Sequence, residues 1–121
     1  MNSYRNTDKD IHGRIYRFVV GSFRDVVKKI PKTVATARII DQLSGSVTSM
    51  GANDQEADAA LTSKDFIAKY TIVRKEAKET EYWLSLVKDL ALVSPKVVLP
   101  YVNECIEIRK IVSSIMEHSR R

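Results

Sequence analysis

Apolar residues recur at alternating spacings of three and four along most of the chain, a pattern typical of helices that bury one face. The first such stretch includes Ile15, Val19 and Val26 and predicts a helix over residues 10–30. Pro31 is expected to end this helix, because proline lacks a backbone N–H and disfavours helical geometry in the residue before it.

Two longer helices are predicted next, over residues 33–61 and residues 62–91. Asp54 falls on the apolar face of the second helix, whose other members are Ile40, Leu43, Val47, Met50, Ala57 and Leu61. Thr62 followed by Asp65 resembles a capping box and marks the start of the third helix. The third helix repeats its apolar positions over about three heptads, which indicates neighbours that lie nearly parallel or antiparallel to it.

The last helix is expected to begin at Ser94-Pro95, a capping residue followed by proline at the first helical position. Pro100 lies too deep in this segment to be harmless. We therefore expect a short first turn over residues 95–99, a kink or break, and a main helix over residues 101–118.

These segments predict an all-α fold, an antiparallel up-down-up-down four-helix bundle. The predicted connections between them are short, which places consecutive helices side by side in opposite directions. No stretch alternates with a period of two, and four glycines and three prolines leave few turns for a sheet. We expect one domain over residues 1–121, with residues 1–9 and 119–121 frayed at the ends.

The sequence contains no recognisable catalytic motif. Its two histidines, His12 and His118, have no cysteine, histidine or carboxylate at metal-ligand spacing on the same helix face. Cys105 lies on the apolar face of the last helix and is expected to act as a small buried hydrophobe. No glycine-rich phosphate loop is present. The sequence therefore predicts no enzyme, no cofactor, no metal and no small-molecule substrate.

A cytoplasmic location is the expectation from the remaining composition. The single cysteine cannot form an intramolecular disulfide, which fits a reducing compartment. The first residues lack the apolar core of a signal peptide. No window approaches the roughly 20 apolar residues that span a bilayer, so no membrane partner is expected.

Positive charge concentrates in the N-terminal half. The net charge is +5, and residues 1–50 carry nine Lys or Arg against four Asp or Glu. The candidate nucleic-acid-binding residues gather on and just after the first helix: Arg14, Arg17, Arg24, Lys28, Lys29 and Lys32. Such a basic surface can follow phosphates, and it can equally be a solvated helix face. The arrangement of aromatic residues on the first helix does not suggest base stacking, which disfavours sequence-specific reading of single strands.

The middle of the second helix departs from its pattern. Gly51 lies inside a helix, where glycine costs about 1 kcal/mol relative to alanine, and a polar run follows it. One interpretation is that this level needs close backbone approach and a polar contact, with Asn53 and Glu56 making buried or interfacial hydrogen bonds. The alternative is that the segment faces solvent.

Parts of the second and third helices resemble the bacterial four helix bundle protein family, whose founding members are encoded by intervening sequences in 23S ribosomal RNA genes. The resembling runs are residues 49–57 (SMGANDQEA), 63–69 (SKDFIAK) and 76–84 (EAKETEYWL). The most specific parts are Asn-x-x-Glu, here Asn53 and Glu56, and Glu-Thr-x-Tyr-Trp-Leu. The family often has Ile-Ala between that Asn and Glu, where this chain has Asp54 and Gln55. The likeness spans residues 15–115.

The resemblance implies a homo-oligomer, a pentameric ring of bundles, with no known enzymatic activity and an association with nucleic acid. A similar fold serves as the accessory protein of diversity-generating retroelements, where it binds a reverse transcriptase and RNA. The candidate polar or interface residues that the family motifs single out are Asn53, Glu56, Glu79, Glu81 and Trp83.

Three hypotheses remain from the sequence. The first is an oligomer that binds RNA or DNA, or acts as a ribonucleoprotein accessory protein, through the basic residues of its N-terminal half. The second is a scaffold that binds only protein, itself included, through apolar residues that widen the buried arc of the third helix. The third is an enzyme, which would need a site shared between subunits around Glu56, Glu79 and Glu81.

Overall fold

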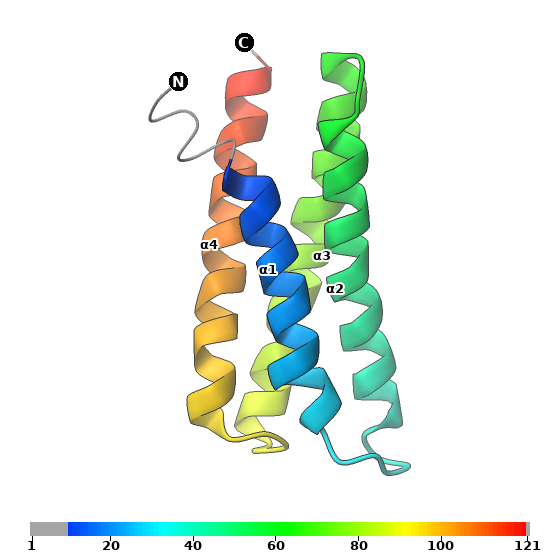
Figure 1. Cartoon of the computed structure of the whole chain (residues 1–121), viewed down its shortest axis with the longest axis vertical. Helices are drawn as coiled ribbons and strands as arrows, with labels where there is room; N and C mark the ends of the chain where they lie inside the picture. The colour runs from blue at the N-terminus through cyan, green and yellow to red at the C-terminus, as the bar shows by residue number, and fades with distance from the viewer. Residues whose placement is uncertain (1–9, 121) are drawn as a thin grey trace.

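The computed structural model describes residues 10–120 and consists of helices, with no strand among these residues. The elements are α1 (Asp10–Asp25), the short 3-10 helix η2 (Val27–Lys29), α2 (Ala37–Asp58), α3 (Ser63–Asp89) and α4 (Pro95–Ser119). Consecutive α-helices run in opposite directions, so the predicted up-down-up-down bundle is confirmed (Figure 1). The expected fraying of residues 1–9 and 121 lies outside the described residues, whereas Ser119 still belongs to α4.

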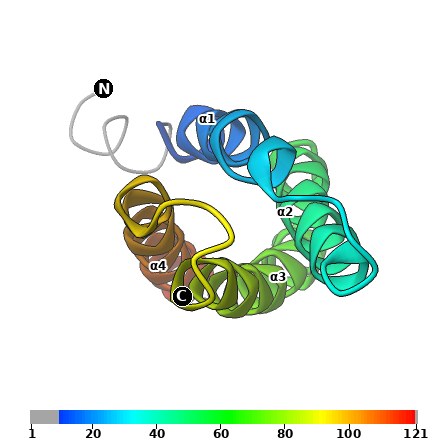
Figure 2. The ribbon, with the colours of Figure 1, turned by 90° about the horizontal axis from the view of Figure 1, so that it is seen from below.

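The four helices form a square when the bundle is seen along its axis (Figure 2). Each helix packs against its two neighbours in the chain order, and α1 closes the square by packing against α4. Buried residues from all four helices fill the centre, among them Ile15, Leu43, Met50, Leu84 and Ile108. The basic helix α1 therefore lies diagonally opposite α3.

The first predicted helix is too long at its C-terminal end. α1 ends at Asp25, and the chain continues through η2 to Ile30, whose backbone is extended. Pro31 accounts for this ending, because it holds the preceding residue out of helical geometry and offers no N–H to continue the ladder. The last turn tightens into 3-10 geometry, a common way to end a helix.

The second predicted helix is too long at both ends. Thr33 and Thr36 bond to each other, with the Thr33 N–H donating to Thr36 Oγ1 at 2.9 Å and the Thr36 N–H donating to Thr33 Oγ1 at 3.2 Å. These local bonds compete with the helical ladder, so α2 begins only at Ala37. α2 ends at Asp58, and Leu61, predicted on the apolar face, is 96% exposed in the following connection.

The start of the third helix is confirmed. Thr62 caps α3 by accepting a hydrogen bond of 3.1 Å from the Asp65 N–H. The helix ends at Asp89, earlier than predicted, because Ala91 takes a left-handed backbone with φ of 54°. The Leu92 N–H then bonds back to the Val87 carbonyl at 3.0 Å and satisfies one of the last free carbonyls.

The predicted break at Pro100 is wrong. α4 begins at Pro95, as expected, and continues without interruption through Pro100. Pro100 removes only the helical bond that its N–H would give to the carbonyl of Lys96. Both residues are exposed. Water can therefore satisfy that carbonyl, and the ring points away from the core.

Gly21 allows the Tyr101 side chain of α4 to lie close against α1. A Cβ atom on Gly21 would lie 2.6 Å from the Tyr101 Oη and 2.9 Å from its Cε1, which no side chain tolerates without movement. Gly51 plays a milder version of this role, since its Cβ would lie 3.2 Å from Val19 Cγ2. The close approach predicted at Gly51 is therefore confirmed.

We expect Gly21→Ala to destabilise the protein by about 1–2 kcal/mol, because displacing Tyr101 outweighs the gain of about 1 kcal/mol in helix propensity. Urea denaturation followed by circular dichroism measures this change. Gly45→Ala is the matched control in α2, where a Cβ atom meets nothing within 4 Å. That variant should gain stability. Equal gains at both positions would contradict the close approach of Tyr101.

Candidate nucleic-acid interface

Two of the six candidate basic residues are engaged in ion pairs within the chain. Arg14 binds Glu104 of α4 with two hydrogen bonds, from Nε at 2.6 Å and from Nη2 at 2.8 Å. Arg24 binds the neighbouring Asp25 in the same two-pronged way. Hydrogen bonds from the Arg24 guanidinium, the larger cause, and from the Tyr101 hydroxyl lower the pKa of Asp25 to about 2. Arg14 and Arg24 thus have part of their charge neutralised locally.

The other four candidates stay available. Arg17, Lys28, Lys29 and Lys32 are exposed, and none forms an ion pair within residues 10–120. Arg17 lies on α1, while the three lysines follow on η2 and in the connection to α2. This connection lies at the same end of the bundle as the α3–α4 connection (Figure 1). We call these four residues the basic surface.

The fold adds two basic residues at this end that the sequence did not indicate. Arg38 lies in the first turn of α2 and Lys96 in the first turn of α4, and both are exposed. They come from separate segments, and only the antiparallel arrangement of the helices places them at the same end. No periodicity within one segment could have indicated this.

A hollow of about 380 Å³ lies beside the basic surface, between α1 and α4. Its lining residues are Arg14, Arg17, Phe18, Pro100, Tyr101 and Glu104. The Tyr101 hydroxyl donates a hydrogen bond of 2.5 Å to Asp25, which fixes the ring across α1. The hollow thus combines an aromatic ring with two guanidinium groups.

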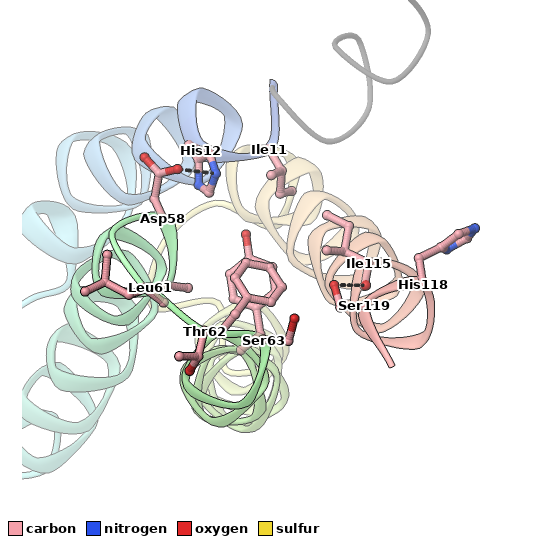
Figure 3. Close-up of a pocket in the computed structure, with 13 residues that line it drawn as sticks. Ile11, His12, Asp58, Leu61, Thr62, Ser63, Ile115, His118 and Ser119 are labelled. Carbon is pink, nitrogen blue, oxygen red and sulfur yellow. Dashed lines mark hydrogen bonds and ion pairs between the residues drawn. The ribbon is translucent and has the colours of Figure 1, made fainter. Parts of the chain in front are cut away.

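A second polar cluster occupies the opposite end of the bundle and joins three helices. Asp54 of α2 is only 1% exposed and accepts a hydrogen bond of 2.7 Å from the Tyr70 hydroxyl of α3. His12 of α1 lies against it, with Nδ1 at 2.9 Å from Asp54 Oδ1. The other ring nitrogen, Nε2, lies 3.2 Å from Asp58 Oδ1 (Figure 3). We call these four residues the histidine cluster.

The surroundings of His12 favour its doubly protonated form. A neutral imidazole carries a proton on only one nitrogen, and here both nitrogens face carboxylate oxygens. The hydrogen bond to Asp54 raises the pKa of His12 above its ordinary value, against the opposing effect of burial, and the charges of Asp54 and Asp58 add to the increase. The cluster therefore ties α1 to α2 through a charged hydrogen bond.

This raised pKa predicts a stability that falls with rising pH. The contribution of His12 is fully present below the unfolded pKa of about 6.5 and is lost as the pH rises through the higher folded value. Urea denaturation from about pH 6 to about pH 8 should show this decline, and His12→Gln should flatten it. The range stops there because burial raises the pKa of the Cys105 thiol to about 12, so its unfolded-state ionisation lowers stability at higher pH. An unchanged slope in His12→Gln would contradict the assignment.

The hollow next to the histidine cluster measures about 530 Å³ and is lined by the ends of all four α-helices and by the α2–α3 connection (Figure 3). His118 lies on its rim but points away from His12 (Figure 3). No group of three or more His, Cys, Asp or Glu side chains in the described part of the chain is arranged to hold a metal ion.

The predicted burial of Cys105 is confirmed. Its side chain is fully buried, and Sγ donates a hydrogen bond of 3.1 Å to the carbonyl of Ala77. A thiol with a pKa raised by burial carries almost no thiolate at neutral pH. Cys105 is therefore a packing residue.

Comparison with known proteins identifies the family. Residues 7–114 match the family described as 23S rRNA-intervening sequence protein. The chain belongs to this family. A crystal structure of a protein of unknown function from the S23 ribosomal protein family of Bacteroides thetaiotaomicron is 32% identical. It superposes with a TM-score of 0.74 and covers 88% of this chain and 97% of its own. No functionally curated protein matches the chain.

The polar motif of α2 sits differently in this member of the 23S rRNA-intervening sequence family than predicted. Asn53 donates its side-chain hydrogen bonds to Ser49 of the same helix, at 2.9 Å to the carbonyl. Glu56 is 58% exposed and pairs with Lys69 of α3 at 2.7 Å. Neither side chain forms a fully buried hydrogen bond among residues 10–120, and an interfacial role for the two residues stays a prediction. The buried hydrogen bonds at this level belong to Asp54.

The motif residues of α3 line its outer face and its contact with α4. Glu81 accepts a hydrogen bond of 3.2 Å from Arg109 of α4. Glu79 accepts one of 3.5 Å from the Trp83 ring nitrogen, and Trp83 packs edge-on against Tyr82. Burial and then the charge of Glu79 raise the pKa of the adjacent Glu76.

The three carboxylates named for a shared catalytic site do not meet within one chain. Glu56 binds Lys69, which precedes Glu79 by ten residues and thus by about 15 Å along α3. Glu79 and Glu81, two residues apart, point to different sides of the helix.

None of the helices is long and apolar enough to cross a membrane, as far as the described residues go.

Proposed function

We propose that this member of the 23S rRNA-intervening sequence family is a non-catalytic, cytoplasmic helical bundle that binds nucleic acid as an oligomer. The basic surface is its contact region, and structured RNA is its preferred partner in a ribonucleoprotein accessory role. Neither a small-molecule substrate nor a membrane belongs to this function. The carrying observation is that Arg17, Lys28, Lys29 and Lys32 are exposed and free of ion pairs within residues 10–120.

The ion-pairing pattern supports this proposal more strongly than the net charge does. Charges that only stabilise the fold can pair with opposite charges three or four residues away or on an adjacent helix. Lys69 and Arg109 pair with carboxylates on the adjacent helix. The residues of the basic surface form no ion pair within residues 10–120, and Lys29 acts on Asp25 only by lowering the pKa of that carboxyl. The charges of the basic surface can therefore replace counterions along phosphates.

Binding to RNA measured against salt concentration tests the proposal. A filter-binding titration with a structured RNA hairpin and a DNA duplex should give tight binding at low salt. Four phosphate contacts predict that log K falls with log salt with a slope of about −3 to −4. The absence of binding at low salt would overturn the function, and so would an affinity that does not change with salt.

A scaffold that binds protein, itself included, is the second candidate. Tyr16 and Val20 of α1 are 66% and 40% exposed. They lie on the outer side of α1, and Tyr16 lines an apolar hollow of about 230 Å³ between α1 and α2. Exposed apolar side chains beside such a hollow favour a protein contact. Self-association of this kind is compatible with nucleic-acid binding, and the pentamer implied by the family resemblance is its expected form.

Light scattering coupled to gel filtration tests this candidate. The protein should run as an oligomer, and Tyr16→Lys should shift it toward monomer, because the new charge would have to be buried in the contact. Val34→Lys is the control, since Val34 is 99% exposed in the α1–α2 connection. A monomer whose mass does not change with concentration would rule out the scaffold.

A further inference from the structure

The hollow between α1 and α4 carries a chemistry that the basic surface alone lacks. Arg14 uses Nε and Nη2 on Glu104, which leaves its Nη1 group directed elsewhere. Arg17 contributes a second guanidinium that forms no ion pair within residues 10–120. Both residues line the same space of about 380 Å³, together with the carboxylate of Glu104. The hollow therefore offers cationic donors and an acceptor within one small volume.

Tyr101 provides an aromatic wall, and the fold holds that wall rigidly. Its hydroxyl is bound to Asp25, and its ring packs across Gly21, where a larger residue would collide with it. Phe18 supports the ring at a centroid distance of 6.2 Å. Tyr101 is only half-buried and lines the hollow. A planar ligand can therefore stack on it without displacing core residues.

We propose that this hollow binds one unpaired nucleotide of the bound nucleic acid, with its phosphate at Arg17 and its base against Tyr101. This proposal rests on the proposed function and specifies the part of the nucleic acid that is recognised. The hollow is within the size range of pockets that hold small ligands, roughly 300–1,000 Å³. A base stacked on both faces within a duplex cannot enter it, whereas a base in a loop, bulge or single strand can.

Base stacking is disfavoured by the sequence alone, because the arrangement of aromatic residues on the first helix does not suggest it. The structure changes this conclusion, since it brings Tyr101 of α4 beside Arg17, which lies more than 80 positions earlier in the chain. Stacking on one aromatic side chain is tolerant of base identity. The expected preference is thus for unpaired over paired nucleotides, without a strong preference among bases.

Three probes distinguish the possible ligands: a single-stranded RNA, a blunt RNA duplex of the same length, and free AMP as a competitor. We expect the single strand to bind about 5- to 100-fold more tightly than the duplex at equal salt, because one base stacks on the protein. Excess AMP should displace it only weakly, since a mononucleotide lacks the contacts to the lysines of the basic surface. A single strand carrying 2-aminopurine should lose fluorescence when its base stacks on Tyr101.

Three variants test the residues named. Tyr101→Leu should remove the preference for the single strand and the loss of 2-aminopurine fluorescence, while binding to the duplex stays. Tyr101→Phe keeps the ring and should keep both properties. Arg17→Gln should weaken single-strand binding more than Lys75→Gln, a matched charge removal on the opposite helix α3, where Lys75 is exposed. If Tyr101→Leu does not fold, the comparison of single strand with duplex on the unsubstituted protein still decides the proposal.

The outcomes separate this proposal from the proposed function. Salt-dependent binding that treats single strand and duplex alike would overturn the nucleotide site and leave the basic surface as a phosphate contact. Displacement by AMP as strong as by the RNA strand would overturn it in favour of a free nucleotide. Failure of every nucleic acid to bind at low salt would overturn the proposed function, and the nucleotide site with it.

Discussion

Replacing Asp54 by alanine should lower the free energy of unfolding by about 2–4 kcal/mol. The Asp54 carboxylate is buried and accepts hydrogen bonds from Tyr70 of α3 and His12 of α1. Its removal takes away an acceptor and leaves the charge of His12 inside the bundle with only Asp58 as partner. His12 keeps some contact with solvent, so the loss should stay below that of a fully buried ion pair. Urea denaturation at about pH 6, where His12 is charged, measures it.

Two further substitutions separate the contributions to this loss. Asp54→Asn keeps the shape and a hydrogen-bond acceptor but removes the charge, so it should destabilise the protein less than Asp54→Ala does. Asp58→Asn is the matched control, because Asp58 faces the same imidazole but is 58% exposed. An exposed pair contributes at most about 1 kcal/mol. Equal losses at Asp54 and Asp58 would contradict a buried cluster that joins three helices.

The bundle could be predicted from the sequence because the pattern of its apolar residues is local. Tyr70, Val73, Ala77, Leu84 and Val87 are all buried, as the spacing on the third helix predicts. The residues at which the helices begin and end could not be predicted from the apolar pattern. The reciprocal bonds of the two threonines before α2 and the left-handed residue after α3 are single-residue features within otherwise compatible sequence.

Pro100 shows how tertiary context overrides a local rule. Proline was expected to break the last helix, and its missing N–H is a real loss. Its position near the exposed start of α4 makes that loss small, because the carbonyl concerned stays accessible to water. The burial on the other side of α4, where Val98, Val102 and Cys105 pack into the core, then favours one continuous helix.

The histidine cluster could be predicted only in part. The sequence placed Asp54 on an apolar face and so marked it as unusual, and it also indicated a polar contact at this level. It could not supply the partners, because His12 and Asp54 are 42 positions apart and no spacing rule connects them. From the sequence, His12 could be compared only with residues on its own helix. The polar contact of the second helix was therefore predicted at Asn53 and Glu56.

The basic surface was predicted by composition, and its division into engaged and free residues was not. Arg14 meets Glu104, which is 90 positions away in the chain. Arg24 meets its immediate neighbour Asp25, which Tyr101 holds in place. Charge counting treats all these arginines alike. Only the structure shows that Arg17 and the three lysines are the residues whose substitution leaves internal ion pairs intact.

The double variant Arg17→Glu, Lys28→Glu should weaken binding to RNA on the order of 100-fold at low salt and reduce the salt slope by about two. Two phosphate contacts are lost, and two negative charges repel the backbone in their place. Both side chains are exposed and free of ion pairs within residues 10–120, so folding should be unaffected. Reversal at Arg24 would test less cleanly, because a glutamate there would face Asp25.

The matched control is Lys64→Glu, Lys75→Glu on α3, diagonally opposite the basic helix (Figure 2). Each replacement changes the charge by two, so both double variants have a net charge of +1 instead of +5. If attraction by the total charge drove binding, the two variants would lose affinity equally. If phosphates contact the basic surface, only the α1–η2 variant should lose the full factor and the slope. Equal losses would therefore remove the surface from the function while leaving the fold and the histidine cluster unaffected.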